Sequence, residues 1–158
     1  MSELRWPVPG VAVIVMDGEK IALVKRMGSE KWSIPCGCID YGEDFVHAAV
    51  REVKEEIGID SEPVKIFNVA SNSWSANGSM WIGSSIAVVL ISRPLSFELT
   101  ADGVEVTEAK WFDITGTLPE LEFVADKYPI EKIKESLLSQ TEISGILLSD
   151  RQTSFIQL

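Results

Sequence analysis

The chain has 158 residues, a length that suits one domain over residues 1–158 with a single sizeable core. Apolar residues make up 46% of the chain and charged residues 24%, and the formal net charge is −10. A charge of this sign disfavours DNA or RNA as the main partner, and no apolar run reaches the roughly 18 residues of a membrane-spanning helix. Residues 1–10 lack the basic start and apolar stretch of a secretory signal, so we expect a cytoplasmic protein.

The start of the chain is expected to form a β-hairpin. Residues 10–16 alternate small and branched apolar side chains, Asp17-Gly18 is a turn signal, and residues 20–25 favour a returning strand. Residues 32–34 favour a short strand that leads into a glycine-containing loop over residues 35–42. The hairpin and this loop therefore precede the first helix.

Two long strands are expected to follow a helix over residues 44–57. Gly58 comes directly after the last helical residue, at a position where glycine commonly ends a helix. Residues 63–71 and 80–91 favour strands, and Pro94 is expected to end the second one. A polar loop joins these two strands.

The last third of the chain is expected to hold a short strand and an amphipathic helix. Residues 108–113 favour the strand, and residues 130–138 favour a helix whose apolar side chains share one stripe. Residues 145–147 and 154–158 favour terminal strands. Mixed strands around one central helix and a terminal helix predict an α/β or α+β sandwich.

Helical periodicity predicts which side of the first helix is buried. At about 100° per residue, Val50, Val53 and Ile57 fall within about 40° of Val46 on the helical wheel. We expect this narrow apolar stripe to pack against the core.

Three glutamates lie together elsewhere on the same helix. With Val46 as zero, Glu55, Glu52 and Glu56 lie at about 180°, 240° and 280°, on a face away from the apolar stripe. Like charges at this spacing destabilise a helix, and the helix dipole disfavours anions near the C-terminus. The arrangement therefore needs a cation, which is either Arg51 in a plain solvated acidic face or a hard divalent cation such as Mg²⁺.

The segment GCIDYGEDFVHAAVREVKEEIGI, from Gly37 to Ile59, resembles the Nudix box. That pattern is Gly-x5-Glu-x7-Arg-Glu-U-x-Glu-Glu-x-Gly-U, with U a bulky aliphatic residue, and every specified position agrees without a gap. The segments GVAVIV, KIALVKR and KWSIPCG resemble the family's first hairpin and its approach to the box, and EVTEAKWFDI resembles a later strand. Similarity to the MutT-like Nudix hydrolases implies an α/β/α sandwich with a mixed central sheet, an N-terminal hairpin and a catalytic loop-helix-loop.

The resemblance implies an activity. Nudix hydrolases cleave a phosphoanhydride bond in a nucleoside diphosphate linked to a further group, with Mg²⁺ as cofactor and Mn²⁺ as a substitute. The expected partner is thus a small nucleotide-type substrate such as a (d)NTP, an oxidised nucleotide or a nucleotide sugar, without a nucleic acid polymer or a membrane. Family members are often homodimers, so a homodimer stays open.

The resemblance also assigns roles to individual residues. Glu52, Glu55 and Glu56 would bind the metal together with the carbonyl oxygen of Cys36, the residue before the box glycine. The catalytic candidates are Glu52, Glu55 and Glu105. Glu55 is a ligand or the base that activates water, and Glu105 lies where several family members place an extra base or ligand.

Further box residues are expected to have structural roles: Gly37, Glu43, Arg51 and Gly58. Arg51 is expected to pair with Glu43 and to orient Glu55 rather than to touch the substrate. The family usually has glycine where this chain has Cys36. If the backbone takes a positive φ there, the side chain costs about 1 kcal/mol or more.

Several alternatives stay open. Glu108 is the rival of Glu105, His47 is expected to be a surface residue, and Trp74 or Trp81 would either stack on a base or pack in the core. The chain could instead be a catalytically idle Nudix-fold binding or sensor module, or an isomerase of prenyl diphosphates on the same scaffold. The sequence does not identify substrate-binding residues.

Overall fold

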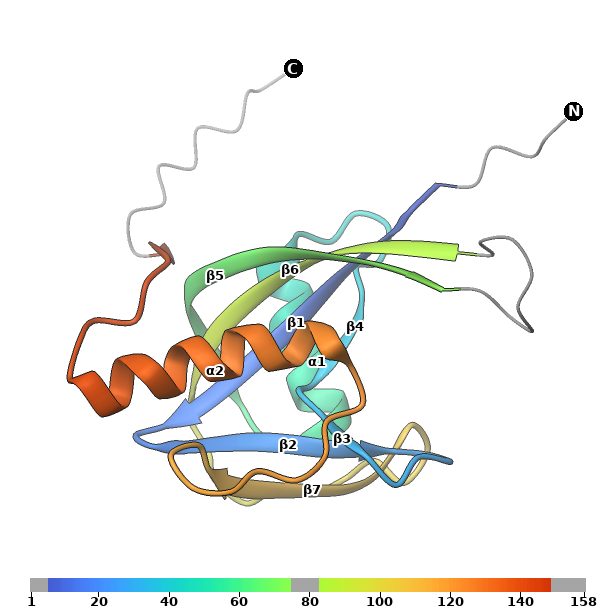
Figure 1. The fold of residues 1–158 in the computed structure, drawn as a ribbon. Coiled ribbons are helices and arrows are strands. Elements are labelled where there is room, and N and C mark those ends of the chain that lie inside the picture. Colours follow the sequence, from blue (N-terminus) through green and yellow to red (C-terminus); the bar gives the residue numbers. More distant parts are fainter. Residues whose placement is uncertain (1–5, 75–82, 149–158) are drawn as a thin grey trace, which may run out of the picture.

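The computed structural model describes residues 6–74 and 83–148 (Figure 1). In chain order the elements are β1 (Val8–Asp17), β2 (Lys20–Arg26), β3 (Trp32–Ser33), β4 (Cys36–Cys38), α1 (Phe45–Ile57), β5 (Ser61–Trp74), β6 (Gly83–Pro94), β7 (Val106–Asp113), α2 (Val124–Ser139) and β8 (Ile146–Leu147). The predicted hairpin, first helix and long strands are therefore present, with some ends displaced by a few residues.

Strand β1 is the centre of a mixed sheet. It pairs in parallel with β6 and antiparallel with β4, and β6 pairs antiparallel with β5. Strands β1 and β2 pair only beside their turn, where Met16 faces Ile21, and they diverge beyond it. Strand β4 pairs along the opened part of β1, while β3 and β7 pair with β2. This divergence makes room for β4 beside the last turns of α1.

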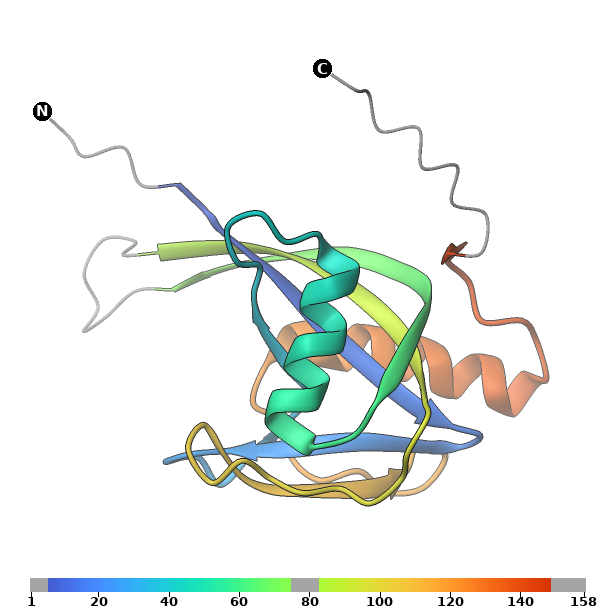
Figure 2. The ribbon, with the colours of Figure 1, turned by 180° about the vertical axis from the view of Figure 1, so that it is seen from behind.

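The two helices cover opposite faces of the sheet (Figures 1 and 2). Alternation along β1 explains how one strand serves both faces. Val11, Val13 and Val15 belong to the core under α1, whereas Ala12 and Ile14 belong to the core under α2. The arrangement is an α/β/α sandwich with a mixed sheet, which confirms the predicted fold class.

Helix α2 begins at Val124 rather than at the predicted Ile130, and Pro129 lies inside it. A proline at an interior position removes one backbone hydrogen bond, which is why the sequence favours a start after it. Ile130 and Ile133 are buried against the sheet. This tertiary packing stabilises a helix that the local sequence alone would shorten.

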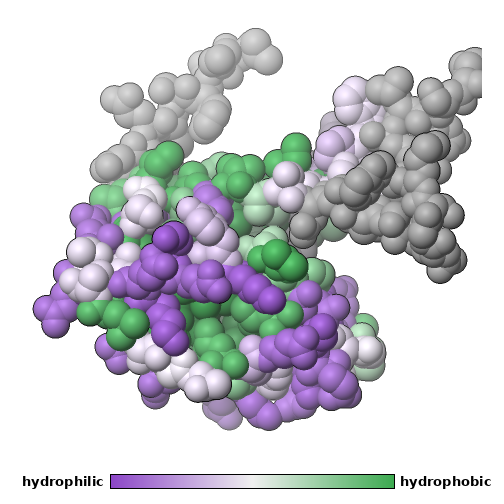
Figure 3. Space-filling view, viewed as in Figure 1, coloured by the Kyte–Doolittle hydropathy of each residue, from purple (hydrophilic) through white to green (hydrophobic). Residues whose placement is uncertain are grey.

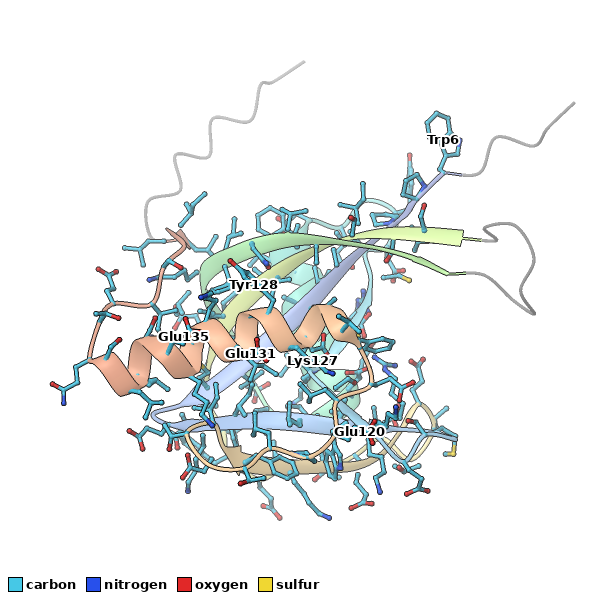
Figure 4. All side chains as sticks on the ribbon, viewed as in Figure 1. Trp6, Glu120, Lys127, Tyr128, Glu131 and Glu135 are labelled. Carbon is cyan, nitrogen blue, oxygen red and sulfur yellow. The ribbon has the colours of Figure 1, made fainter. Side chains whose placement is uncertain are left out.

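The outer face of α2 is polar. Lys127, Glu131 and Glu135 are exposed and point away from the sheet (Figure 4). The space-filling view shows a mainly hydrophilic stretch along this helix (Figure 3). The helix therefore buries its apolar stripe and presents charged side chains to solvent.

The buried face of α1 differs from the predicted one. Val50 is 38% exposed, and the buried residues are Ala48, Ala49, Glu52, Val53, Glu56 and Ile57. The centre of this buried arc lies about 80° from the predicted stripe and close to Glu56. Two small alanines let this side approach the sheet closely, and hydrogen bonds to Glu52 and Glu56 allow both carboxylates to be buried. The prediction that all three glutamates face away from the core is therefore wrong for Glu52 and Glu56.

Some short elements also differ from expectation. The sequence predicts a loop over residues 35–42, but part of it forms β4 because it pairs with β1. The predicted strand over residues 145–147 is β8, which pairs with β5. The predicted strand over residues 154–158 lies outside the described residues, as do Trp81 and the side chain of Trp74. Neither helix in the described part of the chain is long and apolar enough to cross a membrane.

Candidate active site

Caps at both ends fix the position of α1. The carboxylate of Asp44 accepts hydrogen bonds from the backbone N–H groups of Val46 and His47, each at 2.9 Å. Gly58 has φ 76° and donates its N–H to the carbonyl oxygen of Lys54, so it ends the helix in the left-handed conformation. The side chain of His47 is 77% exposed, as expected for a surface residue. These caps place the glutamate cluster in the last two turns.

Gly37 makes room for the carboxylate of Glu52. A Cβ atom at residue 37 would lie 2.0 Å from both Cδ and Oε1 of Glu52. Gly37 is not among the residues with positive φ, so the requirement is space rather than backbone conformation. Glu52 is only 8% exposed, and burial raises the pKa of its carboxyl while Arg51 opposes the shift. The glycine therefore lets this carboxylate pack directly against β4.

Glu56 is the most deeply buried glutamate of the cluster, at 2% exposed. Its Oε2 accepts the backbone N–H of Cys36 at 3.1 Å, and its Oε1 accepts Nη2 of Arg26 at 2.8 Å. Burial raises the pKa of Glu56 to about 7, although Arg26 acts in the opposite direction. Both carboxylate oxygens are thus held by groups from β2 and β4.

Cys36 carries no backbone strain. Its φ is not positive, so the cost considered from the sequence does not arise. The carbonyl oxygen and Sγ of Cys36 contact Nη2 of Arg26, at 2.8 and 3.0 Å. Burial raises the pKa of the Cys36 thiol to about 12, so the sulfur is protonated at neutral pH. Only the carbonyl oxygen is therefore suited to bind a hard cation.

Arg51 joins the loop before α1 to the glutamates. Its Nε and Nη2 donate to the two carboxylate oxygens of Glu43, at 3.0 and 2.8 Å. Nη1 donates to Glu52 at 2.7 Å and to Glu55 at 3.0 Å, and Nη2 also reaches the carbonyl oxygen of Cys38 at 2.8 Å. These contacts raise the pKa of Arg51, whose hydrogen bond to Glu43 is the largest cause. Glu55 keeps a side chain that is 59% exposed.

The structure places Glu105 and Glu108 in different surroundings. Oε2 of Glu105 lies 4.0 Å from Nη1 of Arg26, and its side chain is 70% exposed. Glu108 forms ion pairs with Lys25 and Lys110, and their hydrogen bonds lower the pKa of Glu108. Glu105 is therefore linked to the cluster by its ion pair with Arg26, whereas the ion pairs of Glu108 are with lysines.

The cluster offers oxygen ligands, but in this arrangement arginines occupy them. Among residues 6–74 and 83–148, no three His, Cys, Asp or Glu side chains are grouped so that they could hold an ion as they stand. Instead, Arg26 and Arg51 bind the carboxylates. The donor set consists of oxygens, and the space that a side chain at residue 37 would take is filled by the carboxyl group of Glu52. In its chemistry the cluster fits a hard divalent cation, provided that an arginine yields its place.

A pocket of about 380 Å³ lies on the α2 side of the sheet and is lined in part by Cys36 and Gly37, the residues of β4 that contact Glu56 and Glu52. Its lining is mostly small and apolar, and includes Gly10, Ala70 and Ala87. Strand β4 contributes Cys36, Gly37 and Cys38, and α2 contributes Ala125 and Asp126. The same short strand thus contacts the glutamates and lines a pocket large enough for part of a small ligand.

Asp126 is a buried carboxyl group at this pocket. It is 5% exposed, and its Oδ2 accepts the backbone N–H of Ile34 at 3.3 Å. Burial raises the pKa of Asp126 to about 7. Neither Asp126 nor Arg26 is among the site residues predicted from the sequence. The hydrogen-bond partners of both residues lie far away in the sequence, so no short sequence motif indicates these contacts.

A family model, the NUDIX domain, matches residues 6–132. The match covers most of the chain and includes the glutamate cluster, β4 and most of the sheet. The chain therefore belongs to the Nudix family.

Curated relatives share part of their length with this chain. Nudix hydrolase 10 of Arabidopsis thaliana is 38% identical over 100 residues, which cover 63% of this chain and 35% of the relative. NAD-capped RNA hydrolase NudC of Vibrio atlanticus is 29% identical over 142 residues, which cover 87% of this chain and 47% of the relative. The chain thus spans less than half the length of these two relatives.

Solved structures show the same fold. A MutT NUDIX hydrolase from Burkholderia pseudomallei superposes with a TM-score of 0.70 at 24% identity, covering 82% of this chain and 99% of that one. A UDP-X diphosphatase superposes with a TM-score of 0.68 at 19% identity, covering 88% of this chain and 66% of that one. At these identities the likeness concerns the fold alone.

Proposed function

We propose that this chain is a metal-dependent hydrolase that cleaves a phosphoanhydride bond in a small nucleotide-type substrate, with Mg²⁺ as the cation and Mn²⁺ as a substitute. One observation carries the proposal. The buried carboxylates of Glu52 and Glu56 pack against β4, and β4 also lines the pocket of about 380 Å³. An oxygen-rich cluster that shares a strand with a pocket suits the hydrolysis of a diphosphate by a bound cation.

The proposed roles follow from these positions. Glu52, Glu56 and the carbonyl oxygen of Cys36 would hold the cation, with Glu55 as a further ligand or as the base. A hard divalent cation, when bound, offsets the charge of the diphosphate and lowers the pKa of water. Water attacks one phosphorus atom, the bridging P–O bond breaks, and the bridging oxygen leaves with the other phosphate. The proton from water passes to Glu55 or Glu105.

Charge and the matched proteins together define the substrates to be tested. The net charge of −10 disfavours a long polyanion, so we propose a (d)NTP, an oxidised nucleotide or a nucleotide sugar. The printed names of matched proteins include UDP-X, dihydroneopterin triphosphate and NAD-capped RNA. Capped RNA therefore belongs in the test as well. Cytoplasmic location and a homodimer stay predictions from the sequence.

A product-release assay tests the proposal. The purified chain is incubated with (d)NTPs, oxidised nucleotides, nucleotide sugars and NAD-capped RNA, each with and without Mg²⁺. We expect turnover of at least one small nucleotide only in the presence of the cation, and slower turnover of the RNA. Binding without turnover across the panel would favour the idle binding module. Faster turnover of the RNA would overturn the proposed substrate class.

Two variants identify the proton acceptor on the best substrate of this panel. Glu55 shares a helix with Glu52 and Glu56 and accepts a hydrogen bond from Arg51. Glu105 lies outside this helix and is linked to the cluster by its ion pair with Arg26. We expect Glu55→Gln to lower kcat by about 10²- to 10⁴-fold and to alter the pH–rate profile, and Glu105→Gln to have the smaller effect. The reverse order would assign the role to Glu105. If neither variant slows turnover, both assignments are wrong.

A further inference from the structure

We propose that Arg26 is the resident counter-ion of the glutamate cluster and competes with a divalent cation for Glu56 and the carbonyl oxygen of Cys36. The inference rests on the proposed function, because it takes these oxygens as metal ligands. It concerns the protein without substrate and can therefore be tested by metal binding alone.

A single nitrogen atom of Arg26 contacts both oxygens that the cation would use. Nη2 of Arg26 lies 2.8 Å from Oε1 of Glu56 and 2.8 Å from the carbonyl oxygen of Cys36. Oε2 of Glu56 is already occupied by the backbone N–H of Cys36. A cation that bound Oε1 and the carbonyl oxygen would need the position that Nη2 now holds. The guanidinium group and the cation therefore exclude each other.

Burial explains why a counter-ion is needed when no metal is bound. Glu56 is 2% exposed, and a buried carboxylate without a partner strongly destabilises a folded protein. Arg26 supplies the opposite charge from β2, with a side chain that is itself only 24% exposed. Arg26 therefore stabilises the folded protein when no metal is bound to the cluster.

The two arginines of the site are held to different degrees. Arg51 uses Nε, Nη1 and Nη2, and its acceptors are Glu43, Glu52, Glu55 and the carbonyl oxygen of Cys38. Arg26 makes its hydrogen bonds through Nη2, and its Nε is buried without a partner among the described residues. A guanidinium group with an unpaired buried donor loses less when it moves. Arg26 is therefore the arginine that yields to the cation.

A second carboxylate lies where the released arginine can reach it. Nη1 of Arg26 is 4.0 Å from Oε2 of Glu105, whose side chain is 70% exposed. A small rotation of the arginine toward Glu105 would replace its contact with Glu56. Binding of the cation and pairing of Arg26 with Glu105 then form one coupled change.

Metal titration without substrate tests the competition. Mg²⁺ binding and thermal unfolding are measured for the wild type, for Arg26→Gln and for Lys25→Gln. Lys25 is the matched control, because it is adjacent and equally charged but pairs with Glu30 and Glu108 outside the cluster. We expect Arg26→Gln to lower the melting temperature of the metal-free protein and to bind Mg²⁺ about ten-fold more tightly. Lys25→Gln is expected to change the affinity by less than about three-fold.

A measurement on the wild type covers the case in which Arg26→Gln does not fold. Arginine side-chain NMR signals are followed during the Mg²⁺ titration, and we expect those of Arg26 to shift while those of Arg51 stay close to their starting positions. Unchanged Arg26 signals, or equal Mg²⁺ affinity in wild type and Arg26→Gln, would overturn the inference and leave the proposed function intact. Absence of Mg²⁺ binding in both proteins would overturn the inference and the proposed metal site together.

Discussion

Gly37 occupies a position where one methyl group would collide with the carboxyl group of Glu52. The family pattern requires glycine there, and the structure gives the physical reason, which is the carboxylate of Glu52 lying against the strand. Helical periodicity brings Glu52, Glu55 and Glu56 to one side of the helix, and the resemblance to the box, not the spacing, predicts that they bind a metal. The resemblance to the box also indicates the carbonyl oxygen of Cys36, but nothing in the sequence indicates Arg26, which reaches the cluster from β2 through the folding of the sheet.

Replacement of Gly37 by alanine tests the packing argument. A Cβ atom would lie 2.0 Å from the Glu52 carboxyl, so either the strand or the glutamate must move. We expect Gly37→Ala to lower stability by about 1–3 kcal/mol and to weaken Mg²⁺ binding, as measured by denaturant unfolding and calorimetry. Gly116→Ala is the matched control, because an added Cβ would meet its nearest atom at an ordinary 3.5 Å. Wild-type stability and metal affinity in Gly37→Ala would contradict this account of Gly37.

At the scale of elements, α1 shows both what a pattern can predict and where it fails. The sequence predicts the end of the helix at Gly58 and a start at residue 44, where the structure has Asp44 as the N-cap. Which face of α1 is buried depends on whether its polar side chains form hydrogen bonds in the folded protein. A hydrophobic pattern does not contain that information. Burial of Glu52 and Glu56 beside β4 therefore rotated the helix relative to the prediction. Strand β4 itself depends on β1, which is distant in sequence.

Helix α2 is tied to the rest of the fold by a titratable contact that predicts a dependence of stability on pH. Burial raises the pKa of Asp126 to about 7, so the folded state binds a proton more tightly than the unfolded state does. The stabilisation is therefore complete below about pH 4 and is lost as the pH rises through about 7. Asp126→Asn keeps an oxygen acceptor for the N–H of Ile34 without a charge.

The free energy of unfolding is therefore compared between wild type and Asp126→Asn from pH 4 to pH 8. We expect the wild type to lose about 2–4 kcal/mol relative to the variant over this range, since each pKa unit corresponds to about 1.4 kcal/mol. Glu131→Gln, on the exposed face of the same helix (Figure 4), controls for a change in helix charge. If the free energy of unfolding changes with pH in the same way for wild type and Asp126→Asn, the pKa of Asp126 is not raised and the prediction is wrong.

The whole molecule combines an acidic surface with a site that needs positive charge. The net charge is −10, and within the cluster two arginines neutralise carboxylates that the fold buries. The fold class and the box could be predicted because they rest on periodicity and on one continuous motif. The pocket could not, because its lining comes from β1, β4, β5, β6 and α2, which meet only in the folded chain.

We propose above all that carboxylates from the last turns of α1 bind a divalent cation. Calorimetric titration of Mg²⁺ into the wild type, Glu56→Gln and the control Glu131→Gln tests it most directly. We predict that the wild type and the control bind Mg²⁺ alike and that Glu56→Gln binds it at least about ten-fold more weakly, because one charged oxygen ligand is lost. Equal affinity in all three proteins would contradict the account.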